Sequence, residues 1–366
     1  MTSRLHRFLA GTKVLDLSRH LPGPLATLLL ADMGAEVTKV ESPEGDELRL
    51  IGPKGPHGRS LFFDAINAGK RSIRLDLKTD DGKAALRALA AETDVLVESF
   101  RPGVMTRLGL GADTLRAASP RLIVIAMSGY GQDGPLRDSA GHDANYLAVN
   151  GILSSSGAIG RMSYPYPPMA DCTASMFAVS SILGALIARD RDGLGCEIDL
   201  ALADVVMPFQ IFSLAALGAT DHVPRPETEL LNGGWACYRP YRTSDGRDVT
   251  LGAVEPRFWK SFCHASGRPD WIARHDEPLP QHGLIAELVA HFAALTRDDC
   301  VARYAEADCC FMPVNDLQQA VDSDYMRARG LVRRHPGMNL YEAAYPVCVD
   351  GQRPALREPL REEGPG

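Results

Sequence analysis

The chain of 366 residues lacks the cysteine spacing of a zinc or disulfide protein. None of its eight cysteines forms a C-x-x-C pair, and none stands at zinc-ligand spacing from a pair of histidines. We therefore expect reduced thiols, mostly buried as small apolar side chains, and no structural metal.

Long apolar runs and an excess of positive charge are also missing. No stretch approaches the roughly 18 consecutive apolar residues of a membrane span, and residues 1–11 show no secretion-signal pattern. The 39 Lys and Arg against 46 Asp and Glu leave a net charge of −7, which disfavours general binding to nucleic acid. We expect a cytoplasmic protein in which an anionic ligand needs a local basic patch.

The first strand-to-helix turn lacks the glycines of a dinucleotide-binding loop. Residues 18–24 contain one glycine where the fingerprint needs three, so the backbone cannot approach a pyrophosphate closely. An acid, Glu41, does end the following strand, but we expect no nicotinamide cofactor.

Short β-type runs alternate with helical apolar spacing through the first third of the chain. The expected strands are 13–17, 36–41, 72–77, 95–97 and 122–127, and the expected helices are 25–33, 79–92 and, later, 171–188. The Pro22-Gly23-Pro24 run is interpreted as the break before the first helix. This alternation favours a doubly wound parallel sheet, the sheet of nucleotide-binding folds.

The later sequence predicts a second, smaller domain. An Asp245-Gly246 turn lies between two β-type runs, which is a strong hairpin signal. We expect a large α/β domain over 1–217, a linker over 218–234 and a small α+β domain over 235–325. A C-terminal segment, 326–366, then returns to the large domain.

Two basic clusters are candidates for binding a phosphate. Residues 67–74 precede the third strand, and residues 100–107 follow the fourth. Loops at strand ends bind ligands in α/β sheets, and the planar arginine fork suits phosphate. Solvated surface charge explains the same clusters, and spacing alone leaves both interpretations open.

Three residues are candidates for acid–base chemistry. His142 follows Gly141 at an expected helix start, where backbone N–H groups can stabilise an oxyanion. Asp171 opens the next helix, and Glu255 lies between a strand and a helix. A structural histidine and two plain helix caps account for the same positions, so both interpretations stay open at this point.

Several motifs in their order along the chain resemble the family III CoA-transferase superfamily, and within it the alpha-methylacyl-CoA racemases. They are residues 13–18 (KVLDLS), 22–24 (PGP), 30–37 (LADMGAEV), 39–41 (KVE), 70–72 (KRS), 75–78 (LDLK), 100–103 (FRPG) and 312–316 (MPVND). The resemblance extends over nearly the whole chain.

The racemase branch rests on fewer residues. Residues 141–146 (GHDANY) are similar to the racemase motif that holds the catalytic histidine, and residues 252–256 (GAVEP) to the motif that holds its acidic partner. Asp171 matches the second base of racemases, which is the nucleophile of transferases. The chain departs from racemases beside this position, with Cys172 in place of a frequent glycine and Pro167 in place of an asparagine.

The resemblance implies exchange of the α-proton of a 2-methylacyl-CoA by His142 and Asp171, with Glu255 orienting the histidine and the Asp143 N–H meeting the enolate oxygen. It implies no cofactor beyond the coenzyme A of the substrate, and an interlocked homodimer. The active site would lie between the large domain of one subunit and the small domain of its partner. The family's CoA sites map onto Arg49, Lys70, Arg71, Leu75, Arg101 and Arg107.

Two alternatives remain. One is transfer of CoA between carboxylic acids through an aspartyl-CoA thioester at Asp171. The other is a CoA-binding protein without catalytic activity.

Overall fold

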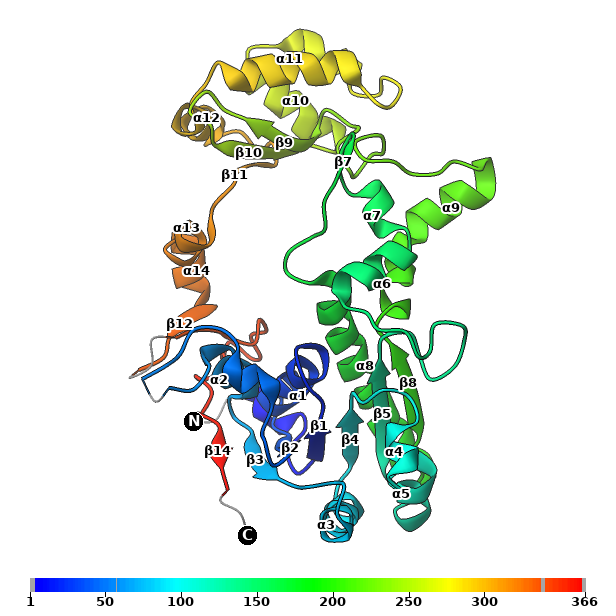
Figure 1. The fold of residues 1–366 in the computed structure, drawn as a ribbon. Helices are drawn as coiled ribbons and strands as arrows, with labels where there is room; N and C mark the ends of the chain where they lie inside the picture. The colour runs from blue at the N-terminus through cyan, green and yellow to red at the C-terminus, as the bar shows by residue number, and fades with distance from the viewer. Residues whose placement is uncertain (1–3, 57, 337–339, 364–366) are drawn as a thin grey trace. The chain divides into compact units, whose positions relative to one another are not determined.

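The computed structural model describes residues 4–56, 58–336 and 340–363, and the chain divides into two compact units (Figure 1). Unit 1 comprises residues 1–150, 166–209 and 323–366, and unit 2 comprises residues 151–165 and 210–322. Each unit has its own sheet and its own helices.

Unit 1 is built on a seven-stranded sheet in which every neighbouring pair is parallel. The strands are β1 (Lys13–Leu17), β2 (Glu36–Glu41), β3 (Arg71–Arg74), β4 (Val95–Glu98), β5 (Ile123–Ser128), β8 (Glu197–Ala201) and β14 (Arg361–Glu362). Their order is β14-β3-β2-β1-β4-β5-β8. The chain reverses its winding between β1 and β4, which is where such sheets bind ligands. The predicted doubly wound parallel sheet is confirmed.

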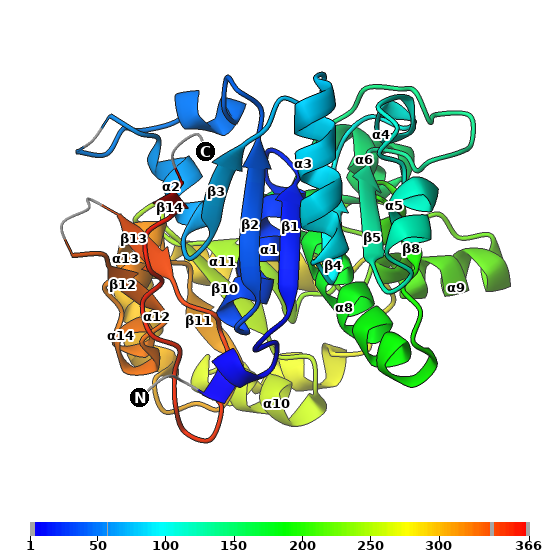
Figure 2. The ribbon, with the colours of Figure 1, turned by 90° about the horizontal axis from the view of Figure 1, so that it is seen from below.

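Helices cover both faces of this sheet (Figure 2). Those of unit 1 are α1 (Pro22–Asp32), α2 (Leu61–Asn67), α3 (Asp80–Ala91), α4 (Val104–Arg107), α5 (Ala112–Ala118), α6 (Asp143–Val149), α8 (Met169–Asp192) and α14 (Asp324–Arg329). Leu15 and Leu17 of β1 pack in a core with Leu86 of α3. Asp16, between them, faces α1, where Thr27 donates a hydrogen bond of 2.6 Å to it.

The first helix begins earlier than the sequence predicts. Pro22, Gly23 and Pro24 form the first turn of α1 and do not break the chain before it. Proline suits this turn because its missing N–H has no acceptor there and its fixed φ is already helical. Gly23 is needed because a Cβ would lie 2.2 Å from the Ser18 side chain.

Helix α8 is, within the described ranges, the one helix long and apolar enough to span a membrane, with a mean hydropathy of 1.6. Here it is packed as a core helix of unit 1. Ser175 donates a hydrogen bond of 2.7 Å to the Pro22 carbonyl of α1, and Arg189 forms an ion pair of 2.8 Å with Asp94. Ala174, Ala178 and Ile182 are fully buried.

Unit 2 has a three-stranded antiparallel sheet in the order β11-β10-β9. Its elements are α7 (Ile152–Ser155), β6 (Gly157–Ala158), β7 (Arg161–Met162), α9 (Ile211–Thr220), β9 (Tyr238–Arg242), β10 (Asp248–Gly252), α10 (Pro256–Ala265), α11 (His282–Ala293), α12 (Arg297–Tyr304), β11 (Phe311–Pro313) and α13 (Leu317–Val321). The predicted hairpin is confirmed as β9 and β10, joined through Gly246 at φ +74°. Stacked Trp259, Phe262 and Phe292 fill the core.

The boundaries between the units differ from the expected ones. Residues 151–165 were expected in the large domain but group with unit 2, where the Ile159 N–H binds the Glu227 carboxylate at 3.2 Å. The stretch 218–234 is part of unit 2 and not a free linker. Residues 218–220 end α9, and the Asn232 amide donates hydrogen bonds to the carbonyls of Ser155 and Arg225.

The C-terminal residues 323–366 group with unit 1. Strand β12 (Val332–Arg334) pairs with β13 (Tyr341–Ala343), and β14 adds to the free edge of β3. Beside this edge the Gly69 N–H donates to the Glu358 carbonyl at 2.6 Å. A polar segment without periodicity therefore completes the parallel sheet.

Candidate active site

Asp171 lies in the first turn of α8. It is the third residue of that helix, because α8 begins at Met169 with Pro168 as its N-cap. The interpretation of Asp171 as a simple N-cap is therefore wrong. The carboxyl group is partly buried, and the helix presents it beside the start of α1, where Ser175 meets Pro22.

The motif at 141–146 is anchored by Tyr146. This buried side chain donates a hydrogen bond of 2.6 Å to the Gly141 carbonyl and packs edge-on against Tyr130. A Cβ at Gly141 would lie 2.8 Å from both tyrosines, and one at Gly129 would lie 2.9 Å from the Tyr146 hydroxyl. The two glycines therefore let the loop after β5 close tightly on Tyr146.

His142 is the N-cap residue of α6, as the sequence predicts for a helix start. Its backbone N–H donates to the Asn145 side chain at 3.0 Å, and its own side chain is exposed. This geometry leaves the imidazole at the surface of unit 1, beside the turn that carries Asp171.

Asp143 connects the two helix starts. One of its carboxylate oxygens accepts hydrogen bonds from the backbone N–H groups of Ala170, at 2.6 Å, and Asp171, at 3.1 Å. Residues 142 and 171, which are far apart in the sequence, are thereby brought to one place.

The pKa of the Asp171 carboxyl is raised to about 6. Burial is the largest cause, the negative charge of Asp143 adds to it, and His142 acts in the opposite direction. Burial, with the charges of Asp171 and Asp143, likewise raises the pKa of Tyr146 to about 12, so this hydroxyl stays a hydrogen-bond donor. Asp171 can therefore carry a proton near neutral pH, as a general acid must.

Glu255 belongs to unit 2, whereas His142, Asp143 and Asp171 belong to unit 1. Glu255 is the N-cap residue of α10, yet its side chain makes no capping hydrogen bond and is exposed. A plain capping role therefore does not account for this acid.

The carboxyl ends of β1 and β4 form a second part of the candidate site. The Arg19 N–H donates to Ser99 at 3.0 Å, and the Arg19 guanidinium lies 5.8 Å from the centre of the Phe100 ring. Arg101 follows directly and is exposed. These residues occupy the point where the winding of the sheet reverses.

Two further arginines lie beside this edge. The guanidinium groups of Arg107 and Arg137 both approach Gly103, where each would be 3.3 Å from a Cβ. No carboxylate in the described part of the chain forms an ion pair with Arg101 or Arg107. Sequence reasoning missed Arg19 and Arg137. The only available signal was that each follows a strand or turn that ends at this edge.

The Lys70 side chain does not lie where a ligand could contact it, although Lys70 was predicted as a CoA contact. Its ammonium group is completely buried and donates to Asp16 at 3.0 Å, and also to the Pro24 carbonyl, Thr27 and Asn67 at 2.8–2.9 Å. Because all its hydrogen bonds are used inside unit 1, this side chain offers no contact to a ligand. It fixes the start of α1 instead.

Arg49 and Arg71 are also engaged by the protein. Arg49 binds both oxygens of Glu41 at 2.7 Å, and Glu362 at 2.8 Å. Arg71 binds Thr38 and Glu363. Leu75 packs at the rim of the core under α3. Of the six predicted CoA contacts, Arg101 and Arg107 are therefore the two with open guanidinium groups, and their contact with CoA stays a prediction.

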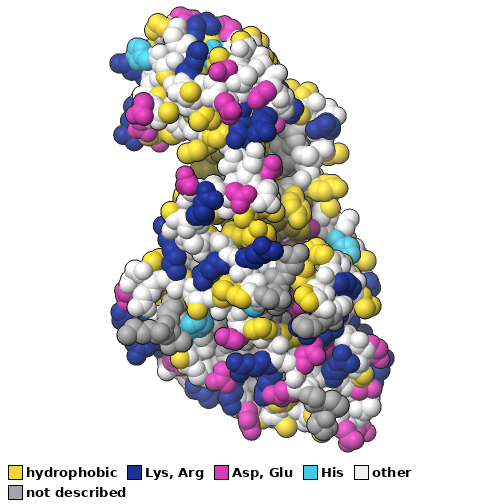
Figure 3. Space-filling model, turned by 90° about the vertical axis from the view of Figure 1, so that its left-hand side faces the viewer, with side chains coloured by type: hydrophobic (Ala, Val, Ile, Leu, Met, Phe, Trp, Pro, Cys, Tyr) yellow, Lys and Arg dark blue, Asp and Glu magenta, His cyan; other side chains and the backbone are white. Residues whose placement is uncertain are grey.

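Other features of the described residues contribute no catalytic group. They contain no group of three or more His, Cys, Asp and Glu that could hold a metal ion. The eight cysteines are free, and Cys237, Cys263, Cys300 and Cys309 are buried. On the face shown in Figure 3, basic and acidic side chains are interspersed. A large surface of one charge does not form there.

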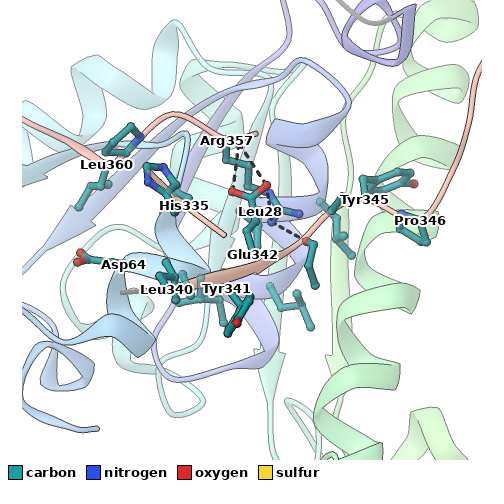
Figure 4. Close-up of a pocket in the computed structure, with 18 of the residues that line it drawn as sticks. Leu28, Asp64, His335, Leu340, Tyr341, Glu342, Tyr345, Pro346, Arg357 and Leu360 are labelled. Carbon is teal, nitrogen blue, oxygen red and sulfur yellow. Dashed lines mark hydrogen bonds and ion pairs between the residues drawn. The ribbon is translucent and has the colours of Figure 1, made fainter. Parts of the chain in front are cut away.

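A cavity of about 410 Å³ lies in unit 1, between α1, α2, β13 and the C-terminal segment (Figure 4). Leu28, Ile66 and Leu360 give it an apolar wall. Its Arg357 is held by both oxygens of Asp32 at 2.7 Å. Neither His142 nor Asp171 lines it, so this cavity is separate from the candidate active site.

Fold and site together define an α/β protein with a histidine and a partly buried aspartate near the carboxyl edge of a nucleotide-type sheet. The family model described as CoA-transferase family III matches residues 9–360, and the chain belongs to this family.

Racemases and CoA-transferases are both found among the relatives, at similar sequence identity. Human alpha-methylacyl-CoA racemase is 33% identical, with 88% of this chain and 81% of that protein covered. Human succinyl-CoA:glutarate CoA-transferase is also 33% identical, with 90% and 77% covered. The crystal structure of a CAIB/BAIF family protein from Brucella suis has 28% identity and a TM-score of 0.83, with 98% and 96% covered. The family is thus shown, and the reaction within it is a separate question.

Proposed function

We propose that this protein interconverts the two configurations of a 2-methylacyl-CoA by removing and returning the α-proton. The observation that carries the proposal is the histidine beside the aspartate, His142 at the start of α6 and Asp171 in the first turn of α8. A two-base reaction needs two such groups, whereas acyl transfer needs only the carboxylate nucleophile.

In one direction the His142 imidazole accepts the α-proton, and the electron pair of the broken C–H bond moves to the thioester oxygen. The Asp171 carboxyl then donates its proton to the opposite face of the same carbon. The roles reverse for the other configuration. The pKa of about 6 at Asp171 supports this assignment because about a tenth of the carboxyl groups still carry a proton at pH 7, far more than at an ordinary aspartate.

The developing oxyanion needs a hydrogen-bond donor. Asp143 is the first residue of α6, so its backbone N–H has no acceptor within the helix, and the positive end of the helix dipole lies there. We assign this N–H to the enolate oxygen. A fixed donor of this kind is worth about 3–4 kcal/mol of transition-state stabilisation.

The proposal also includes the binding of CoA and the assembly of the site. The phosphate groups of CoA are bound by Arg19, Arg101 and Arg107. The reaction uses no metal or nicotinamide, and the protein acts in the cytoplasm. The chain forms an interlocked homodimer in which Glu255 of one subunit orients His142 of the other. The apolar side chains of α9 are exposed, Phe212 to 76%, and this supports the proposal that a second subunit covers them. Sedimentation that shows reversible monomers at micromolar concentration would contradict the dimer.

The deciding experiment uses a 2-methylacyl-CoA in heavy water without any acceptor acid. A racemase incorporates deuterium at the α-carbon, as seen by mass spectrometry or loss of the proton signal. His142→Ala should lower this rate by about 10²–10⁴-fold, because it removes one general base. His282→Ala, a change at an exposed histidine of α11, is the matched control and should exchange at the wild-type rate.

CoA transfer is the second candidate, supported by the transferase relative at equal identity. In that reaction Asp171 attacks the thioester carbonyl and expels the CoA thiolate, which leaves the acyl group on Asp171 as a mixed anhydride. The thiolate then attacks the Asp171 carbonyl of this anhydride, which releases the donor carboxylate and forms an aspartyl-CoA thioester. Hydroxylamine would trap this thioester, and His142→Ala would retain most activity. If hydroxylamine traps the thioester and no α-deuterium is incorporated, the protein is a transferase and not a racemase.

A further inference from the structure

Helix α8 begins without a capping side chain of its own. A helix leaves its first N–H groups without intrahelical acceptors, and Ser, Thr, Asp or Asn at the N-cap normally satisfies one of them. The N-cap here is Pro168, which makes no side-chain capping hydrogen bond. Its carbonyl accepts only the Cys172 N–H, at 3.1 Å.

The missing acceptor comes from another helix. A single oxygen of Asp143 accepts from both Ala170, at 2.6 Å, and Asp171, at 3.1 Å. Asp143 itself directly follows His142 and begins α6. One carboxylate therefore joins the turn that carries the histidine to the turn that carries the aspartate.

We propose that the Asp143 side chain is a positioning residue that caps α8 from α6 and so holds the Asp171 carboxyl in place relative to His142. This role is separate from that of the Asp143 backbone N–H. It rests on the proposed function where activity is the readout, but the cap itself can be tested without activity.

The cap has an electrostatic consequence. The Asp143 carboxylate, a negative charge, accepts two N–H groups at the positive end of α8. That charge adds to burial in raising the pKa of Asp171, and His142 opposes it. Tyr146 and Cys172 are the other titratable groups that interact with Asp171, and both have raised pKa values. The same carboxylate therefore contributes both to the position of Asp171 and, after burial, to its proton affinity.

Two substitutions separate these effects. Asp143→Asn keeps an oxygen that can accept both hydrogen bonds and removes the charge, whereas Asp143→Ala removes both. Amide hydrogen exchange at Ala170 and Asp171, followed by NMR, reports the cap directly. We expect faster exchange in Asp143→Ala and near wild-type exchange in Asp143→Asn. Unchanged exchange in both variants would overturn the cap.

The carboxyl carbon signal of Asp171, titrated by NMR, reports its proton affinity, and kcat reports the alignment. We expect the Asp171 pKa to fall in both variants. The α-proton exchange rate should fall by about 10²-fold in Asp143→Ala, since misplacement of about 1 Å has that cost, and recover in part in Asp143→Asn. Equal losses in both variants with an unmoved Asp171 titration would overturn the positioning role.

Thr296→Ala is the matched control. Thr296 caps α12 in unit 2, where it accepts the Asp299 N–H at 3.1 Å, so the variant loses a helix cap away from α8. Its Asp171 titration should equal that of the wild type. If the protein proves to be a transferase, the exchange and titration measurements still decide the role of Asp143.

Discussion

Glu98, a buried acid at the end of β4, allows a test of how a buried negative charge lowers the stability of unit 1. This last residue of β4 is only 7% exposed, and one carboxyl oxygen accepts the Phe100 N–H at 2.6 Å. Burial raises its pKa from 4.5 to about 7; the Phe100 hydrogen bond opposes this shift, and Glu197 and Asp199 add to it. The folded chain therefore binds a proton there that the unfolded chain releases at lower pH.

The sign of the pH dependence follows from this difference. Below pH 4.5 the carboxyl is protonated in both states and costs nothing. Between pH 4.5 and about 7 stability falls as pH rises, because the unfolded state loses its proton first. At about 1.36 kcal/mol for each pKa unit, the whole loss is about 3 kcal/mol. Glu98→Gln keeps an acceptor for Phe100 and has no proton to lose.

Thermal unfolding at pH 5 and pH 8 measures the effect. We expect a midpoint for Glu98→Gln that is about 2–3 °C higher than that of the wild type at pH 5 and about 6–12 °C higher at pH 8, at about 2–4 °C per kcal/mol for a domain of this size. Glu36→Gln, at an exposed position of β2, is the control and should follow the wild type at both pH values. A constant difference between Glu98→Gln and wild type across this range would refute the reasoning.

Three further expectations concern the site and its support. Lys70→Met should destabilise unit 1 by about 3–5 kcal/mol in urea unfolding, because it leaves the buried Asp16 without its nearest ion-pair partner; a loss below 1 kcal/mol would show that Lys39 compensates. Arg101→Ala should weaken acetyl-CoA binding by about tenfold or more in a thermal-shift titration, while NAD stabilises neither protein. Gly141→Ala should cost about 1–3 kcal/mol because its Cβ meets two tyrosine rings. Gly184→Ala, with open space at its Cβ inside α8, should not destabilise.

Local pattern alone predicted much of unit 1. The limits of β1 and β2 match the expected strands to the residue. The β9–β10 hairpin followed from its Asp-Gly turn in the same way. The start of α1 was misplaced because Pro-Gly-Pro is both a break signal and a good first helical turn.

The tertiary structure decided what each charged residue does. A basic run at 67–74 has the same appearance whether its members bind phosphate or protein, yet Lys70 is enclosed by α1 and β1 while Arg101 remains open. The reason is that ion pairs such as Lys70 with Asp16 join residues 54 positions apart. No local spacing encodes that distance.

The same holds for the candidate active site. The sequence by itself determined that His142 and Asp171 begin helices and resemble an acid–base pair. Only the fold showed that Asp143 joins the two turns and, with burial, raises the Asp171 pKa. Hydrogen bonds and desolvation depend on neighbours in space, and those neighbours exist only once α6 and α8 have packed on the sheet.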